Sequence, residues 1–366
     1  MTIRNPIEAH ENVTTLSASE IAARTQRAKA ALGSQLLVLG HHYQRDAIIR
    51  FADRVGDSFG LARHAASCGE GRWVVFCGVH FMAETADILT PERVTVLLPD
   101  RQAGCSMADM ADIDDVEACW EECTEVCGPC LVPVTYMNST AVIKAFTADK
   151  GGAVCTSSNA AGVLRWAFEQ RDKVLFIPDQ HLGRNTCFFR LGMPLADTIV
   201  WDPRRKLGGN TPEALRRARV ILWQGHCSVH ANFQPEHVDM ARRRDPAVRV
   251  IVHPECTFEV VEKADFVGST EFITRTIAAA EPRSSWAVGT EHNLVGRLAA
   301  AHPDRKIQTL SPFACQCSTM YRIDPVDLMR TLEGIPRGEL RWPIHVPVEV
   351  AVRARVALER MLSIPA

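Results

Sequence analysis

The sequence has no marked excess of either charge and no long apolar run. Its 366 residues include 41 Lys and Arg against 43 Asp and Glu, which gives a formal net charge of −2. A chain this close to neutral offers no general positive field to a nucleic acid or to an anionic membrane. No uninterrupted apolar stretch approaches the roughly 18 residues that span a bilayer, and the N-terminal segment lacks the apolar core of a signal peptide. We therefore expect a cytoplasmic protein that acts on small molecules and binds neither nucleic acids nor membranes.

The composition also excludes a disordered, collagen-like or coiled-coil chain, since 46% hydrophobic and 23% charged residues are ordinary proportions for a globular protein. At about 150 residues per domain, the length predicts two to three domains. Ten short apolar runs recur along the chain, and a helical pattern follows most of them. These runs span residues 36–39, 73–76, 94–98, 132–134, 174–177, 198–201, 220–223, 248–252, 286–288 and 307–310. Continuous apolar runs of this length are typical of parallel strands buried on both faces, which predicts an α/β fold.

Several helices can be predicted from their end signals. The first begins at Ser17, where Glu20 completes a capping box, and ends near Gly33. Residues 212–219 and 235–244 each begin with proline and suit crossover helices between parallel strands. Ten strands could form one large sheet or three small sheets.

Polar side chains gather just after the apolar runs. Ligands of open α/β sheets bind beyond the carboxyl ends of the strands, so these positions are candidates for a site. A single Asn, Ser or Asp there could simply cap the next helix. One cluster consists of such cap types alone, Ser157, Ser158 and Asn159. The clusters that include His, Tyr or Glu are harder to explain as caps; they contain His41, Tyr43, Tyr136, Asn138, Asp179, His181, His226, Cys227, His253, Glu255, Thr290 and Glu291.

Thirteen cysteines are present, an odd number and a high one for a protein expected in a reducing compartment. The densest group is Cys119, Cys123, Cys127 and Cys130, whose last three members have the C-x3-C-x2-C spacing of enzymes that bind a [4Fe-4S] cluster and S-adenosylmethionine. Here the residue before the last cysteine is Pro129, where that family favours an aromatic residue. The alternative is a helix over 114–125 followed by a Cys-Gly-Pro-Cys loop, with a separate zinc or redox role left open.

Three other cysteines each follow an apolar run. Cys105, Cys227 and Cys317 are separated by 122 and 90 residues, about the length of one small α/β domain. Three thiolates from three domains would suit a [4Fe-4S] cluster in which one iron has no protein thiolate and acts as a Lewis acid. Spacing alone does not select this triple from thirteen cysteines.

Eleven segments, in order along residues 20 to 335, give the sequence a resemblance to quinolinate synthases, the iron–sulfur enzymes of de novo NAD biosynthesis. They include the segments GHHYQ from Gly40, ADRVGDS from Ala52, GCSM from Gly104, PVTYMNS from Pro133, CTSSNA from Cys155, PDQHLGRN from Pro178, GHCSVH from Gly225, HPEC from His253, VGST from Val267 and CSTM from Cys317. The segment from Cys77 to Ala86 is the remaining one. Position 42 departs from the family pattern, with His where other members have Asn or Tyr.

The resemblance implies three pseudo-equivalent small α/β domains of three layers, with parallel sheets around a central [4Fe-4S] active site. The expected divisions are residues 1–110, 111–230 and 231–366. The implied reaction condenses iminoaspartate with dihydroxyacetone phosphate to quinolinate and releases phosphate and water. The resemblance also suggests functional coupling to L-aspartate oxidase.

By motif match, the resemblance assigns the cluster ligands to Cys105, Cys227 and Cys317; Met320, three residues on, favours Cys317 over Cys315. The implied substrate-binding residues are His41, Ser58, Tyr136, Met137, Asn138, Ser157, His253, Pro254, Glu255 and Thr270. The implied acid–base residues are Glu255, Tyr43, Tyr136, His41 and His253.

These residue types suit the implied chemistry. Hydroxyls of Ser58, Ser157 and Thr270 and the amide of Asn138 can donate to substrate carboxylates, and His, Tyr and Glu can move protons. Which base acts at each step does not follow from the sequence. Three other functions stay open: an aconitase-like [4Fe-4S] hydroxy-acid dehydratase, a radical S-adenosylmethionine enzyme that uses Cys123, Cys127 and Cys130, and a non-catalytic iron–sulfur sensor.

Overall fold

A computed structural model of the chain describes residues 16–69 and 71–365. It shows an α/β protein whose described residues form three sheets. The described residues divide into two compact units. The first unit comprises residues up to 56, 60–104 and 318–345, and the second comprises 57–59, 105–317 and the residues from 346 onward. The α/β class predicted from the apolar runs is confirmed, while the three-domain division with its particular boundaries stays a prediction.

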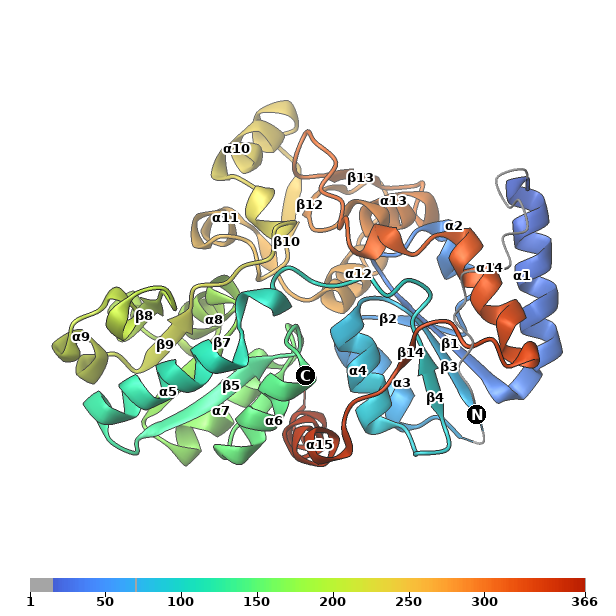
Figure 1. The fold of residues 1–366 in the computed structure, drawn as a ribbon. Coiled ribbons are helices and arrows are strands. Elements are labelled where there is room, and N and C mark those ends of the chain that lie inside the picture. Colours follow the sequence, from blue (N-terminus) through green and yellow to red (C-terminus); the bar gives the residue numbers. More distant parts are fainter. Residues whose placement is uncertain (1–15, 70, 366) are drawn as a thin grey trace. The chain divides into compact units, whose positions relative to one another are not determined.

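The first unit contains one five-stranded sheet of order β14-β4-β3-β1-β2 (Figure 1). Its strands are β1 (Leu36–His41), β2 (Arg54–Gly56), β3 (Trp73–Cys77), β4 (Thr95–Leu97) and β14 (Pro343–Ile344). Its helices are α1 (Ala18–Leu32), α2 (Asp46–Ile49), α3 (Ser58–Ala66), α4 (His80–Leu89) and α14 (Pro325–Gly334). Helix α3 belongs to this unit only from Gly60 onward, because its first two residues are part of the second unit. Helix α1 has the predicted ends: Ser17 and Glu20 form a capping box, and Gly33 follows the last turn.

The second unit contains two parallel sheets. One has the order β6-β5-β7-β9-β8 and the other β11-β10-β12-β13. The strands of the first are β5 (Leu131–Tyr136), β6 (Ala153–Cys155), β7 (Lys173–Ile177), β8 (Thr198–Trp201) and β9 (Val220–Trp223). Those of the second are β10 (Arg249–Val252), β11 (Phe266–Val267), β12 (Ser285–Gly289) and β13 (Lys306–Thr309).

The helices of the second unit mostly connect consecutive parallel strands. They are α5 (Ile113–Cys127), α6 (Ala141–Asp149), α7 (Ala160–Gln170), α8 (Gln180–Asn185), α9 (Pro212–Arg217), α10 (Pro235–Arg244), α11 (Phe258–Lys263), α12 (Thr270–Ala278), α13 (His292–Ala301) and α15 (Val348–Ser363). The C-terminal helix α15 packs against α6 and β6. No helix in the described part of the chain combines the length and the hydropathy needed to cross a membrane.

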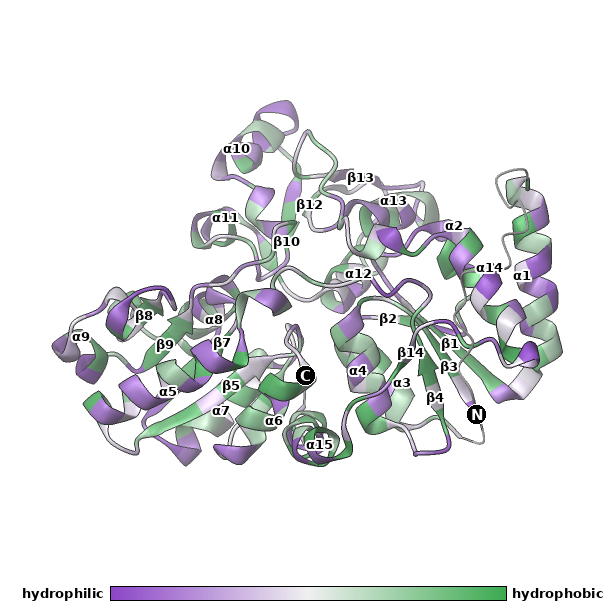
Figure 2. Ribbon diagram, viewed as in Figure 1, coloured by the Kyte–Doolittle hydropathy of each residue, from purple (hydrophilic) through white to green (hydrophobic). Residues whose placement is uncertain are grey.

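Side chains on the two faces of the β5–β9 sheet pack against different helices, because successive residues of a strand point to opposite faces. Leu175, Ile177 and Ile221 belong to one apolar core with residues of α5, α6 and α9. On the other face Gly183 of α8 lies so close to Phe176 that a Cβ there would meet its ring at 2.8 Å. The sheet is therefore covered on both sides, and most strands are apolar (Figure 2).

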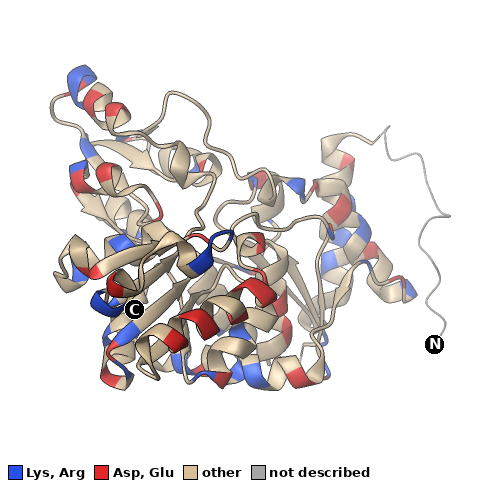
Figure 3. Ribbon diagram, turned by 60° about the vertical axis from the view of Figure 1, so that its left-hand side comes forward, with Lys and Arg blue, Asp and Glu red and all other residues tan. Residues whose placement is uncertain are grey.

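All ten predicted strands are present, but four short ones were not predicted: β2, β6, β11 and β14. Strand β14 also departs from the all-parallel expectation, since it pairs antiparallel with β4 through Pro343 and Ile344. It lies at the sheet edge, where a proline without an N–H can be accommodated. Acidic and basic residues are interspersed, mainly on helices and turns (Figure 3), as the near-neutral charge suggests.

Candidate active site

The predicted site residues follow the carboxyl ends of strands in both units. In the first unit, His41 is the last residue of β1, and Tyr43 lies in the next turn. In the second unit the corresponding positions are Ser58 at the start of α3; Cys105 after β4; Tyr136, Met137 and Asn138 at the end of β5; Ser157 after β6; Cys227 after β9; His253, Pro254 and Glu255 after β10; Thr270 at the start of α12; and Cys317 after β13. This is the edge at which parallel α/β sheets bind ligands.

Glu255 is the centre of a buried hydrogen-bonded group in the second unit. Its side chain is 3% exposed. The Tyr136 hydroxyl donates to Glu255 Oε1 at 2.5 Å. His230 Nδ1 lies 2.6 Å from the other carboxylate oxygen, Oε2. Each oxygen therefore has its own partner, one from the end of β5 and one from the turn after β9.

Two stacked histidines support this group. The rings of His230 and His253 lie 4.4 Å apart between centroids with an interplanar angle of 18°. His230 Nε2 lies 3.2 Å from Thr290 Oγ1, and His253 Nε2 lies 3.2 Å from Ser157 Oγ. His253 Nδ1 accepts from the main-chain N–H of Glu255 at 3.3 Å. These contacts fix both rings at buried positions.

Burial and the neighbouring charges set the protonation of the group. Burial, together with a smaller effect of His230, lowers the pKa of His253 to about 3 although Glu255 opposes the shift, so that His253 is neutral at neutral pH. Burial by itself would raise the pKa of Glu255, but His253, His230 and the hydrogen bond from Tyr136 lower it. The group therefore presents an ionised carboxylate that accepts a hydrogen bond from the Tyr136 hydroxyl and lies against the His230 ring.

Asn185 holds the loop that contains Glu255. It is 2% exposed, and its Nδ2 donates to the main-chain oxygens of Pro254 and Cys256, both at 2.8 Å. These two carbonyls flank Glu255, so one amide fixes the backbone on both sides of the carboxylate. Asp179 caps α8 by accepting from the N–H groups of His181 and Leu182, at 2.7 and 3.0 Å. The cap orients the short helix at whose end Asn185 lies.

The three cysteines singled out by sequence lie close together in the second unit. Burial raises the pKa of Cys105 to about 12, and the nearby Cys317 and Glu255 contribute. Burial likewise raises the pKa of Cys227, with contributions from Glu255, Cys105 and Cys317. Each of the three is followed, three residues later, by the first residue of a 3₁₀ turn: Ala108, His230 and Met320.

The backbone around these thiols favours metal ligation. The N–H groups of Met107 and Ala108 donate to the sulfur of Cys105, and that of His230 donates to Cys227. Such bonds stabilise a thiolate, the form in which cysteine binds iron. Among the described residues, one group of three possible metal ligands has its ligand atoms within 4.8 Å of one another. These atoms are Cys227 Sγ, a ring nitrogen of His230 and a carboxylate oxygen of Glu255. Cys227 therefore lies directly beside the buried carboxylate.

The structure also separates Cys317 from its neighbour Cys315. Cys315 is 3% exposed and belongs to the apolar core of the β10–β13 sheet, where its Sγ donates to Phe313 O at 3.7 Å. Burial raises its pKa, and its nearest charged neighbour is Glu291, not Cys105 or Cys227. Glu291 caps α13 and accepts from the main-chain N–H of Cys317, which anchors the loop that contains both cysteines.

The remaining predicted residues have less defined contacts. His41 Nδ1 accepts from the N–H of Tyr43 at 3.2 Å, and their rings meet edge to face with centroids 4.7 Å apart. Asn138 Oδ1 is buried without a hydrogen-bond partner, which suits an atom reserved for a ligand. Thr270 is 3% exposed at the first turn of α12, where N–H groups face outward from the helix end.

Two residues of the site were not predicted individually. His230 belongs to the recognised Gly225–His230 segment, and Asn185 ends the recognised Pro178–Asn185 segment. The motif match was the available signal in both cases. Neither residue follows a strand directly, so position along the chain gave no reason to single it out.

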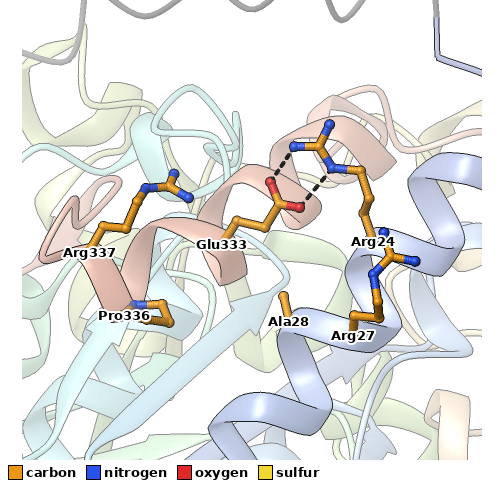
Figure 4. Close-up of a pocket in the computed structure, with 6 residues that line it drawn as sticks. All are labelled: Arg24, Arg27, Ala28, Glu333, Pro336 and Arg337. Atoms are coloured by element: carbon orange, nitrogen blue, oxygen red, sulfur yellow. Dashed lines mark hydrogen bonds and ion pairs between the residues drawn. The ribbon is translucent and has the colours of Figure 1, made fainter.

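A separate surface pocket lies in the first unit between α1 and α14 (Figure 4). Its volume is about 370 Å³, and its lining consists of Arg24, Arg27, Ala28, Glu333, Pro336 and Arg337. The Arg24 guanidinium already donates two hydrogen bonds to Glu333, at 2.8 and 2.7 Å. None of the predicted site residues lines this pocket.

Comparison with known proteins gives a consistent result. The family model described as quinolinate synthetase A protein matches residues 23–363. A quinolinate synthase of Herpetosiphon aurantiacus is 53% identical over 360 residues, covering 98% of this chain and 96% of the relative. Those of Bacillus velezensis and Streptomyces coelicolor are 52% and 53% identical, covering 95% and 98% of this chain and 94% and 92% of the relatives.

Proposed function

Because the chain belongs to the quinolinate synthetase A family, we propose that it condenses iminoaspartate with dihydroxyacetone phosphate to form quinolinate, phosphate and water. The observation that best supports this is the buried Glu255, hydrogen-bonded to Tyr136 and His230 and adjacent to three clustered cysteines. A reaction that forms a ring and eliminates water needs proton transfer beside an electrophilic centre; the Glu255 group would transfer the protons, and the cysteines would hold that centre.

Cys105, Cys227 and Cys317 would hold a [4Fe-4S] cluster. The donor set fits, since the three thiols are neighbours, two of them (Cys105 and Cys227) receive main-chain N–H groups at sulfur, and all three lie apart in sequence from the four cysteines at 119–130. When bound, the cluster supplies an iron without a protein thiolate that can act as a Lewis acid on substrate oxygen. Thirteen free thiols also suit a reducing compartment, and we place the enzyme in the cytoplasm.

Hydroxyl and amide groups would bind the two carboxylates of iminoaspartate. Ser157, Thr270 and Ser58 offer hydroxyl donors, and the side chain of Asn138 has a buried carbonyl oxygen and an amide donor. Met137 and Pro254 lie beside Tyr136 and Glu255 along the chain and would form the apolar wall of the site. The N-terminal end of α12, at which Thr270 lies, would add to anion binding through the partial positive charge of the helix terminus.

The Glu255 group would move protons. Its ionised carboxylate can accept a proton from substrate carbon or nitrogen, while the Tyr136 hydroxyl donates to one of its oxygens and His230 Nδ1 lies 2.6 Å from the other. Neutral His253, whose Nε2 faces the Ser157 hydroxyl, can serve as a further proton donor or acceptor. His41 and Tyr43, at the end of β1, are proposed to contribute in the same role.

An anaerobic assay on the reconstituted enzyme tests the proposal. We expect quinolinate to form only when dihydroxyacetone phosphate and a source of iminoaspartate, such as L-aspartate with L-aspartate oxidase, are both present. The control omits the triose phosphate and supplies citrate. Dehydration of citrate would instead indicate a hydroxy-acid dehydratase, cleavage of S-adenosylmethionine would indicate a radical enzyme, and a full cluster without turnover would indicate a sensor.

The Asn185 contacts give a prediction about positioning. In Asn185→Asp the two N–H donors are replaced by a carboxylate oxygen facing two carbonyls, so the Glu255 loop should shift. We expect kcat to fall by about 10- to 100-fold, the range for a misplaced catalytic group, with unchanged iron content. Asn210→Asp is the matched control, because Asn210 Nδ2 also donates only to main-chain oxygens, those of Val200, Leu207 and Gly208. Equal losses in both variants would contradict a specific role for Asn185.

A further inference from the structure

The cysteine group at residues 119–130 has no part in the proposed reaction. Cys119 and Cys123 lie one turn apart on α5, are buried, and have their sulfurs 4.0 Å from each other. Cys127 is the last residue of α5, and Cys130 directly precedes β5. Cys127 and Cys130 are partly exposed, so the group consists of a shielded pair and an accessible pair.

The accessible pair is folded together by a tight turn. Gly128 ends α5 with φ of +76°, a conformation that glycine adopts without strain, and its N–H donates to Thr124 O at 2.8 Å. The N–H of Cys130 donates to Gly128 O at 2.9 Å. The Cys130 sulfur then donates to the main-chain oxygen of Cys127 at 3.2 Å. The chain therefore turns within four residues and places the Cys130 thiol against the main chain of Cys127.

Helix geometry argues against one metal ion bound by all four cysteines. Cys119 and Cys127 are eight residues apart on α5, which corresponds to about 12 Å along the helix axis. Ligands of one zinc or iron ion lie within about 4 Å of each other, given metal–sulfur bonds of about 2.3 Å. In the described part of the chain, the group of three ligand types within 4.8 Å is the one at Cys227, not one at residues 119–130.

We propose that Cys127 and Cys130 form a dithiol site that exchanges with an external disulfide, either a small-molecule disulfide or the oxidised pair of a dithiol oxidoreductase. One thiolate of the pair attacks a sulfur of the external disulfide, whose S–S bond breaks and releases one thiol. The second thiolate attacks the resulting mixed disulfide and releases the other external thiol. Two protons and two electrons thus pass from the cysteine pair to the external disulfide, and a Cys127–Cys130 disulfide remains.

The electrostatic setting of the pair indicates the direction of exchange. Burial raises the pKa of Cys127, while the Lys173 ammonium opposes this shift. Lys173 begins β7, and its main-chain N–H donates to Cys130 O at 3.1 Å, so its position beside the pair is fixed by the sheet. Strongly oxidising pairs have a stabilised thiolate form. Burial works against the thiolate form of Cys127, so the disulfide should be stable and the reduced pair should give up electrons to the external disulfide.

The exchange site and the Glu255 group lie at opposite ends of one strand. Cys130 precedes β5 and Tyr136 ends it, and a six-residue strand at about 3.3 Å per residue separates them by roughly 20 Å. Oxidation of the pair should therefore leave quinolinate formation within about twofold of its reduced value. The oxidation state of the pair would follow the ratio of thiols to disulfides around the enzyme and would not alter the catalysed reaction.

Differential alkylation and peptide mass spectrometry test this on the anaerobically reconstituted holoenzyme. Glutathione disulfide is the small probe and oxidised thioredoxin the protein probe, each in a separate arm. We expect the peptide that contains Cys127 and Cys130 to lose two hydrogens and resist alkylation, and to recover with excess dithiothreitol. Oxidation in one arm alone identifies the source of the disulfide, and oxidation in both arms shows that either source serves.

Single substitutions make the test specific. Cys127→Ser and Cys130→Ser should each stop at a mixed disulfide with the probe, because no second thiol can resolve it. Cys123→Ser, the matched buried control, should still form the Cys127–Cys130 disulfide. Full alkylation of Cys127 and Cys130 in both arms, or oxidation of Cys119 with Cys123 instead, would overturn the inference. The mass readout does not depend on turnover, so a failure of the proposed function leaves this result interpretable.

Discussion

Alanine at position 105, 227 or 317 is expected to abolish the iron–sulfur cluster of the reconstituted protein. Each of these cysteines offers a thiol whose neighbours are the other two, and loss of one leaves two thiolates for a cluster that needs three. Iron and acid-labile sulfide analysis should fall from about four of each per chain towards zero. The thiolate-to-iron absorbance, at roughly 400 nm, should disappear with them.

Cys315→Ala is the matched control, because Cys315 lies two residues from Cys317 but packs into the core of the β10–β13 sheet. It should keep the cluster, with a modest loss of stability from one truncated core side chain. Retention of the cluster in Cys317→Ala together with its loss in Cys315→Ala would reverse the assignment within this pair. Loss in all four variants would point to a general folding defect, which circular dichroism of the unreconstituted proteins would reveal.

The apolar runs predicted the sheets well because a strand covered on both faces must be apolar throughout. Each of the ten runs became a strand, including the five interior strands of the β5–β9 and β10–β13 sheets, namely β5, β7, β9, β10 and β12. The strands that escaped prediction, β2, β6, β11 and β14, have two or three residues. Segments this short have no periodicity to detect, and they form because a neighbouring strand offers free backbone groups.

The site was harder to predict because its members meet only in the tertiary structure. Tyr136 and Glu255 are separated by 119 residues, and no local pattern links them. The family motifs identified both, but they gave no basis for the role of His230. Its partners Glu255 and Thr290 follow β10 and β12, and only the order of these strands brings them to the turn after β9.

The cysteines illustrate the same limit. Thirteen cysteines allow many triples, and the group of three possible metal ligands that lie within 4.8 Å of one another among the described residues includes Cys227 and none of the densest group, at 119–130. Helical periodicity does explain that group, since Cys119 and Cys123 share the apolar face of α5. What distinguishes Cys105, Cys227 and Cys317 is their equivalent position before a 3₁₀ turn in three separate loops, which sequence spacing does not reveal.

Glu255→Gln should lower kcat by about 100-fold or more, the usual scale for loss of a general acid–base group. Glutamine keeps the shape of the side chain but has no negative charge, and its amide can accept from only one of the two donors, Tyr136 and His230. The cluster should still form, because none of its three cysteines is altered. Steady-state kinetics on the reconstituted variant, with iron content measured on the same sample, would separate lost chemistry from lost cofactor.

Thr270→Val provides the contrast, because a hydroxyl with ordinary acidity is a poor base at neutral pH but a good donor to a carboxylate. This variant should mainly raise KM and leave kcat close to wild type. The loss of binding free energy should be that of one charge-assisted hydrogen bond, roughly 1.5–3 kcal/mol. If Glu255→Gln showed this KM-dominated pattern instead, Glu255 would position substrate and the proton transfer would pass to Tyr136, Tyr43 or His253. Tyr136→Phe then decides, since it removes the only hydroxyl bonded to Glu255 Oε1 among the described contacts and leaves the ring in place.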